Sequence, residues 1–149
     1  MPLFETQVVI GCPLDQAFEF FLRPANALKI SPPGLGLHFV KAPDLLDVGS
    51  QIEFKVQGWG QIQSMIHRIT HIDRPNLYVE EQVKGPFKRW VHTHLFAIDQ
   101  EDRTVITDRI DFDPPGGIIG MLISKDKILE HLEDGFDHRH MQLEKLFGG

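Results

Sequence analysis

Two short turn signals, Gly58-Trp59-Gly60 and Gly85-Pro86, punctuate the middle of the chain, and strand-like sequence lies on both sides of each. Segments that are joined by such short turns pair as antiparallel neighbours. The sequence therefore predicts one antiparallel sheet. Its expected strands cover residues 3–10, 37–41, 50–57, 61–72, 77–84, 87–98 and 103–113.

The strand region ends at Pro114-Pro115-Gly116-Gly117, and the longest helical pattern of the chain follows this cluster. Apolar residues recur there at intervals of three, four and seven, which is typical of one face of a helix. The pattern predicts one continuous helix over residues 118–147 whose apolar face packs into the core. That face consists of Ile118, Leu122, Leu129, Leu132, Phe136, Leu143 and Phe147.

Two shorter helices are expected after the first strand. Pro13 suits the start of a helix, because the N–H that proline lacks would have no partner there. The apolar residues that follow recur at helical spacing and predict a helix over residues 14–22. A second short helix over residues 24–30 ends before the proline pair Pro32-Pro33.

The composition narrows the class of protein and its partners. At 149 residues the chain suits one domain, which we expect to span residues 1–149. Its 15 basic and 21 acidic residues give a formal net charge of −6, which argues against a nucleic-acid-binding protein. We expect a monomer or a homodimer.

Three absences bear on the cellular location. The chain has no run of 18 apolar residues, so we expect no integral membrane segment. Its first residues show no basic region followed by an apolar run, as a signal peptide would. Cys12 is the single cysteine and cannot form an internal disulfide. Together these features favour a soluble protein of the cytoplasm.

The order of the expected elements is one strand, two short helices, several antiparallel strands and a long C-terminal helix. A curved sheet of about six to seven strands, wrapped around the long helix, buries both apolar faces. The expected fold class is therefore α+β. Because such a sheet cannot close tightly along the whole helix, we expect a cavity between them that admits a small molecule.

The segment that begins at Gly85 carries the clearest resemblance to a known family. It reads Gly85-Pro86-Phe87-x-x-Trp90-x-His92-x-His94-x-Phe96 and is followed by Thr104, Asp108 and Pro114. This pattern resembles the bacterial polyketide cyclase/dehydrase-like branch of the START and birch-pollen-allergen-like superfamily (SRPBCC). Further similarities to that branch are Pro13, Phe18, Phe21, Pro32-Pro33 and Phe136-x-x-Arg139.

The resemblance covers nearly the whole chain and implies the helix-grip fold, in which a curved sheet grips a long C-terminal helix. Members of the superfamily bind lipids, sterols, quinones, polyketides or hormones, and only some of them catalyse a reaction. The resemblance thus implies a small apolar ligand, without identifying it, and does not specify a reaction.

Strand parity indicates which residues of the last two strands face inward. In residues 103–113 the even positions form the apolar face, and Asp108 is its single charge. That face consists of Thr104, Ile106, Asp108, Ile110 and Phe112. The even positions of the preceding strand are Trp90, His92, His94, Phe96 and Ile98.

The length of the connecting loop decides whether these two faces meet. With an odd loop, such as Gln100-Glu101-Asp102, His94 lies opposite Asp108 and Phe96 lies opposite Ile106. An even loop would separate Asp108 from the histidines. We predict the odd loop, because it turns the aromatic and apolar residues of both strands inward together.

The expected His94–Asp108 pair has three interpretations. It can be a structural pair that compensates a buried carboxylate and fixes the strand register. With His92, it can orient the polar group of a bound ligand. It can also be catalytic, with Asp108 raising the basicity of His94 for general-base chemistry of the cyclase or dehydratase type.

A metal site at His92 and His94 needs a third ligand. His67 and His71 are four residues apart on one expected strand and so share a face, but nothing in the sequence places them beside His92. We therefore expect no metal and no other cofactor.

Three other positions have open interpretations. Glu80 and Glu81 are adjacent on one strand, so one faces inward and the other outward, and the sequence does not decide which. Arg139 either reaches a ligand or, as we favour, forms a salt bridge at the rim of the sheet. Trp59 lies at a turn tip, where it either borders a pocket or packs across the turn.

We conclude from the sequence that a small apolar molecule, such as a lipid, quinone or polyketide, binds between the sheet and the C-terminal helix. The predicted ligand-binding residues are Trp90, His92, His94, Asp108, Phe54, Phe96, Ile106 and Phe112. One alternative is a cyclase or dehydratase that uses His94 and Asp108 as an acid–base pair. Another is a small interaction or regulatory protein.

Overall fold

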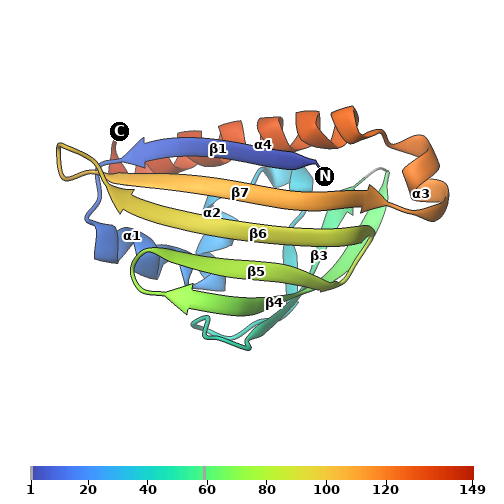
Figure 1. Ribbon diagram of the computed structural model, residues 1–149, viewed down its shortest axis with the longest axis horizontal. Coiled ribbons are helices and arrows are strands. Elements are labelled where there is room, and N and C mark those ends of the chain that lie inside the picture. Colours follow the sequence, from blue (N-terminus) through green and yellow to red (C-terminus); the bar gives the residue numbers. More distant parts are fainter. Residues whose placement is uncertain (1, 59) are drawn as a thin grey trace.

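The computed structural model describes residues 2–58 and 60–149 and shows an antiparallel sheet of seven strands (Figure 1). The strands lie across the sheet in the order β1-β7-β6-β5-β4-β3-β2. Their bounds are Leu3–Ile10 (β1), His38–Lys41 (β2), Gln51–Gly58 (β3), Gln61–Asp73 (β4), Leu77–Lys84 (β5), Phe87–Ile98 (β6) and Thr104–Pro115 (β7). The predicted antiparallel sheet is confirmed, while Trp59 lies outside the described residues.

The first strand of the chain lies beside the last one. Ile10 pairs with Thr104 and Leu3 pairs with Asp111, so β1 runs antiparallel to β7. From β2 to β7 each strand neighbours the next one in sequence. The sheet is therefore a meander of hairpins to which the N-terminal strand is added at one edge.

The helices are α1 (Leu14–Phe21), α2 (Ala27–Ile30), α3 (Gly117–Leu122) and α4 (Lys125–Phe147), with 3₁₀ turns at Pro24–Asn26 and Pro33–Leu35. In Figure 1, α1 and α2 lie behind the sheet and α4 runs along β1. A curved sheet, two short helices after β1 and a long C-terminal helix confirm the expected α+β class. None of the helices in the described parts of the chain is long and apolar enough to cross a membrane.

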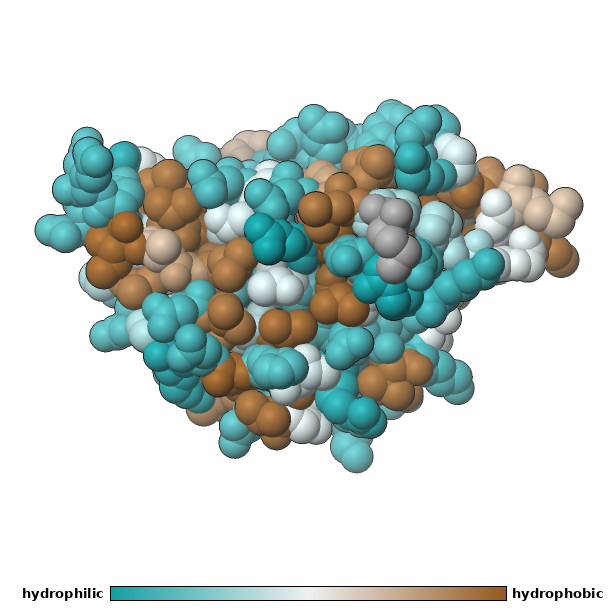
Figure 2. All heavy atoms as spheres, in the orientation of Figure 1, coloured by the Kyte–Doolittle hydropathy of each residue, from teal (hydrophilic) through white to brown (hydrophobic). Residues whose placement is uncertain are grey.

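The expected single helix over residues 118–147 is wrong, because the chain breaks between α3 and α4. Ile123 is extended, with φ −119° and ψ 115°, and the Ser124 hydroxyl accepts a hydrogen bond from the backbone N–H of Lys127. A serine cap of this kind starts a new helix. As a result Ile118 and Leu122 are 77% and 76% exposed, and Figure 2 shows apolar residues at the end where α3 lies.

The core has two parts on the inner face of the sheet. One lies under α1 and the end of α4 and includes Phe18, Ile106 and Leu143. The other lies under the first half of α4 and includes Phe112 and Phe136. The even positions of β7 from Thr104 to Phe112 face this core, as strand parity predicted, and each of them is at most 1% exposed.

Candidate functional site

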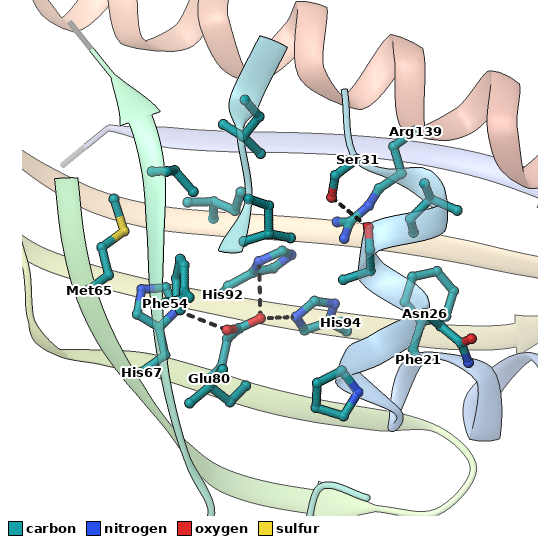
Figure 3. A pocket seen from close by; sticks show the side chains of 18 of the residues that line it. Phe21, Asn26, Ser31, Phe54, Met65, His67, Glu80, His92, His94 and Arg139 are labelled. Carbon is teal, nitrogen blue, oxygen red and sulfur yellow. Dashed lines mark hydrogen bonds and ion pairs between the residues drawn. The ribbon is translucent and has the colours of Figure 1, made fainter. Parts of the chain in front are cut away.

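A cavity of about 310 Å³ lies between the inner face of the sheet and helices α2 and α4 (Figure 3). Much of its wall is apolar, as is usual for a small-molecule site. Apolar lining residues include Phe21, Ile30, Leu35, Phe39, Ile52, Phe54, Val56, Met65, Trp90, Leu132 and Phe136. The polar lining residues are Asn26, Ser31, His67, Tyr78, Glu80, His92, His94 and Arg139.

Glu80 lies at the centre of the polar part of the cavity wall (Figure 3). Nδ1 of His67 donates to its Oε2 over 2.9 Å, and Nε2 of His94 donates to its Oε1 over 2.7 Å. Nδ1 of His92 lies 3.6 Å from the same Oε1. One carboxylate from β5 thus meets three imidazoles from β4 and β6.

Asp108 of β7 lies behind the histidines, away from the cavity. Nε2 of His92 donates to Oδ1 of Asp108 over 2.8 Å, while Nδ1 of His94 lies 3.3 Å from that oxygen without forming a hydrogen bond. The rings of His92 and His94 stack with centroids 3.7 Å apart, and Tyr78 stacks on His94 at 4.0 Å. Each of these two histidines therefore lies between two carboxylates.

The strand register brings these groups together. Glu80 pairs with His92 across β5 and β6, and His94 pairs with Asp108 across β6 and β7. The predicted register of the last two strands is confirmed. The hydrogen bond differs from the expectation, because His94 turns its Nε2 toward Glu80 and leaves His92 to donate to Asp108.

Both carboxylates of the cluster are ionised. Burial raises the pKa of Glu80, but hydrogen bonds from His67 and His94 outweigh burial and hold this pKa well below its usual range. Burial raises the pKa of Asp108 too, but the hydrogen bond from His92 and the charges of His92 and His94 outweigh burial and depress this pKa.

The pKa values of the two stacked histidines, His92 and His94, shift in opposite directions. Burial, helped by the neighbouring charge on His94, lowers the pKa of His92 to about 4, so this ring is neutral near pH 7. Burial also opposes a charge on His94, but its contacts with Asp108 and Glu80 outweigh burial and raise its pKa. Of the two rings, His94 is therefore the one whose surroundings favour the protonated form.

Half of the predicted ligand-binding residues line the cavity and half do not. Phe54, Trp90, His92 and His94 are in its wall, and the buried indole N–H of Trp90 has no hydrogen-bond partner among the described residues. Placing the other four in the wall was wrong, because neighbouring side chains cover them. They are Asp108, Phe96, Ile106 and Phe112.

The covering groups can be identified. Phe96 packs against Phe18 of α1, with ring centroids 5.1 Å apart, and Ile106 belongs to the same core cluster. Phe112 lies against Phe87 and Trp90, so an aromatic layer separates it from the cavity.

Sequence reasoning missed His67 and left Glu80 undecided. The shared face expected for His67 and His71 is wrong, because a β-bulge shifts the register between Ile69 and His71. His67 is therefore buried in the cavity wall, whereas His71 is exposed. Glu80 faces inward with Tyr78, and Glu81 is exposed.

Arg139 extends from α4 toward the cavity (Figure 3). Its guanidinium carbon lies 5.2 Å from the ring centroid of Phe136 and 5.9 Å from that of Phe21. The favoured salt bridge at the sheet rim is not found, since no acidic residue of the described chain lies within ion-pair distance of this guanidinium. Arg139 thus brings a positive charge to a largely aromatic wall.

Three side chains of the cluster could hold a metal ion. One donor atom from each of Glu80, His92 and His94 lies within 4.8 Å of the other two. The sequence offered no third ligand beside the two histidines, and the structure supplies one in Glu80.

Comparison with protein-family models and with curated proteins gives no match. Solved structures match over nearly the whole chain. A protein from Chromobacterium violaceum has a TM-score of 0.76 at 14% identity, over 100% of this chain and 99% of its own. A protein from Thermus thermophilus has a TM-score of 0.70 at 16% identity, and the match covers 97% of this chain and 99% of the Thermus protein. Ginseng major latex-like protein 151 from Panax ginseng has a TM-score of 0.65 at 17% identity, and the match covers 94% of this chain and 95% of the ginseng protein.

At these identities the likeness shows the fold. This chain has the helix-grip fold, and the latex-like protein of ginseng shares it. The narrower resemblance to the polyketide cyclase/dehydrase-like branch stays a prediction from the sequence.

Proposed function

We propose that the protein binds a small apolar molecule that carries an acidic group. The observation behind this proposal is a cavity of about 310 Å³ with an aromatic and aliphatic wall and an arginine that has no acidic partner among the described residues. Burial of apolar ligand surface supplies most of the affinity in such a site, and a few polar groups fix the orientation. As part of the proposal, the protein acts in the cytoplasm as a binder of such molecules.

Arg139 supports an acidic group on the ligand. A guanidinium on aromatic rings gains some cation–π stabilisation but retains its N–H donors. A carboxylate can accept two of these donors at once, which is the strongest way to satisfy them. The ionised Glu80 has its own donors in His67 and His94, and its charge disfavours an anion at that end of the cavity.

The acid–base alternative has less support. Both ring nitrogens of His94 face carboxylates, Nε2 toward Glu80 and Nδ1 toward Asp108. A general base needs a nitrogen directed at the substrate. Asp108 is 1% exposed and lies outside the cavity wall. The arrangement therefore favours binding over cyclase or dehydratase chemistry by this pair.

The proposal is tested with the neutral fluorescent probe N-phenyl-1-naphthylamine and two displacing ligands, decanoate and 1-decanol. The wild-type protein is expected to bind the probe and to release it to decanoate at lower concentration than to decanol. Arg139→Gln should weaken decanoate binding by roughly tenfold to a hundredfold, the value of a hydrogen bond to a charged group, and leave decanol binding unchanged.

Arg23→Gln is the matched control, because Arg23 is exposed and does not line the cavity. Absence of probe, decanoate and decanol binding by the wild-type protein refutes ligand binding. Equal affinity for decanoate and decanol, unaffected by Arg139→Gln, refutes the acidic group while leaving the apolar site in place.

A further inference from the structure

His92 lies between two carboxylates, and its hydrogen bonding on the Asp108 side differs from that on the Glu80 side. At the Asp108 edge, Nε2 of His92 donates to the carboxylate over 2.8 Å. An ionised carboxylate only accepts, so the proton of the His92 ring is on Nε2. The other ring nitrogen, Nδ1, is left with an unshared electron pair on the Glu80 edge.

This unshared pair faces another electron-rich atom. Nδ1 of His92 lies 3.6 Å from Oε1 of Glu80, which is too far for a hydrogen bond. Nε2 of His94 lies 2.7 Å from the same oxygen. Two nitrogens and one carboxylate oxygen thus converge, and a positive ion between them would relieve the repulsion at His92.

The distances fit a small divalent cation. Zinc takes nitrogen and oxygen ligands at about 2.0–2.2 Å in a tetrahedron, which places neighbouring donor atoms roughly 3.4 Å apart. The observed separations of 2.7 and 3.6 Å lie on either side of that value. Because the rings stack, ligation requires each imidazole to rotate about its Cβ–Cγ bond so that the ion lies nearer both ring planes.

The surrounding residues already have the form of an outer ligand shell. Metal-bound histidines usually direct their second nitrogen at a carboxylate or carbonyl, which fixes the ring orientation. Asp108 lies at that second nitrogen in both rings, 2.8 Å from His92 and 3.3 Å from His94. His67 holds the second oxygen of Glu80 over 2.9 Å.

We infer that Glu80, His92 and His94 form a binding site for a divalent transition-metal ion of the zinc class. The ion replaces the proton that His94 shares with Glu80, and Asp108 and His67 orient the three ligands. With three protein ligands, the fourth coordination position opens toward the cavity, which all three residues line. This inference does not depend on the proposed apolar ligand.

The test uses the full-length protein, stripped with a chelator and then titrated with cobalt(II) chloride. Four-coordinate cobalt(II) reports its own site through visible ligand-field absorption. One equivalent per chain is expected to give this absorption, and zinc sulfate should displace it. Glu80→Gln and His92→Gln should each weaken binding by roughly a hundredfold or more, and Asp108→Asn by about tenfold to a hundredfold.

His71→Gln is the matched control, because His71 is an exposed histidine of the same strand as His67. It should bind cobalt(II) like the wild type, and so should Arg139→Gln, which separates this site from the proposed ligand site. Circular dichroism checks that each variant is folded. Absence of a one-to-one complex in the wild type overturns the inference whatever the variants do, and so does cobalt(II) binding that folded Glu80→Gln and His92→Gln retain unchanged.

Discussion

Asp108 lies in an environment that leaves little freedom for substitution. Its carboxylate is 1% exposed and is compensated by His92 and by the charge on His94. A buried ion that loses its compensation is costly, and the partners that it leaves behind are also buried. Asp108 and the two histidines therefore compensate one another, and removing either side would leave the other buried without its partner.

Asp108→Asn keeps the shape of the side chain and removes its charge. We expect the free energy of unfolding to fall by about 1–3 kcal/mol, because charge-assisted hydrogen bonds become neutral ones and the charge on His94 loses a partner. Urea denaturation of the metal-free protein measures the change. Asp44→Asn, at an exposed aspartate, should stay within about 0.5 kcal/mol of the wild type, and equal effects of the two substitutions would contradict the role given to Asp108.

Strand alternation, together with the choice of an odd connecting loop, predicted that Asp108 and His94 face each other, because a run of apolar neighbours marks the inner face of β7. It was not sufficient for Glu80. Val79 and Val83 make the opposite face of β5 look apolar, yet Val83 is 48% exposed. Glu80 turns inward because it pairs with His92, and such cross-strand partners are not visible from one strand alone.

At the scale of elements, the break between α3 and α4 shows what the apolar pattern of a helix cannot predict. The apolar spacing continues from Ile118 to Phe147, but Ser124 offers a cap that ends this continuity. Helix propensity and periodicity describe the interior of a helix, whereas the first turn is decided by the few groups that satisfy its unpaired N–H donors. The β-bulge in β4 is a comparable case, since one extra residue reverses the parity of His71.

Ser124→Ala removes the only side-chain cap of α4 that the described residues provide. We expect a loss of about 1 kcal/mol in the free energy of unfolding, the usual value of a serine N-cap. Chemical denaturation followed by circular dichroism measures it, with Ser64→Ala at an exposed site of β4 as the control. Fraying at the start of α4 should leave the distant Arg139 in place, so loss of decanoate binding by this variant would argue against a local effect.

For the whole molecule, the order of elements predicted the helix-grip fold and the existence of a cavity between its two layers. The positions of Ile30 and Leu35 in the cavity wall could not be predicted from the sequence, because they depend on how α2 and the turn after it lie on the sheet. Two core clusters, one at each end of α4, hold the layers together. The cavity is lined by residues of both clusters, such as Phe21 and Phe136.

Ala27→Trp tests whether ligand binding depends on this space. Ala27 lines the cavity from α2, so a tryptophan there fills volume that a ligand would occupy. Binding of N-phenyl-1-naphthylamine is expected to weaken roughly tenfold or more, with the loss measured by fluorescence titration. Ala25→Trp, at an exposed position of the preceding turn, should bind the probe normally. Unchanged binding by Ala27→Trp would place the probe elsewhere on the protein.

The pairing of β1 with β7 has a consequence for the synthesis of the protein. Residues Leu3–Ile10 leave the ribosome early, and their partner strand, Thr104–Pro115, leaves after most of the chain has been made. Contacts between segments this distant in sequence form slowly, because a long loop must close before they contribute. The nascent chain therefore carries an unpaired β1 and an open core until β7 has been made. The sheet is therefore completed late, when β7 takes its place between β1 and β6.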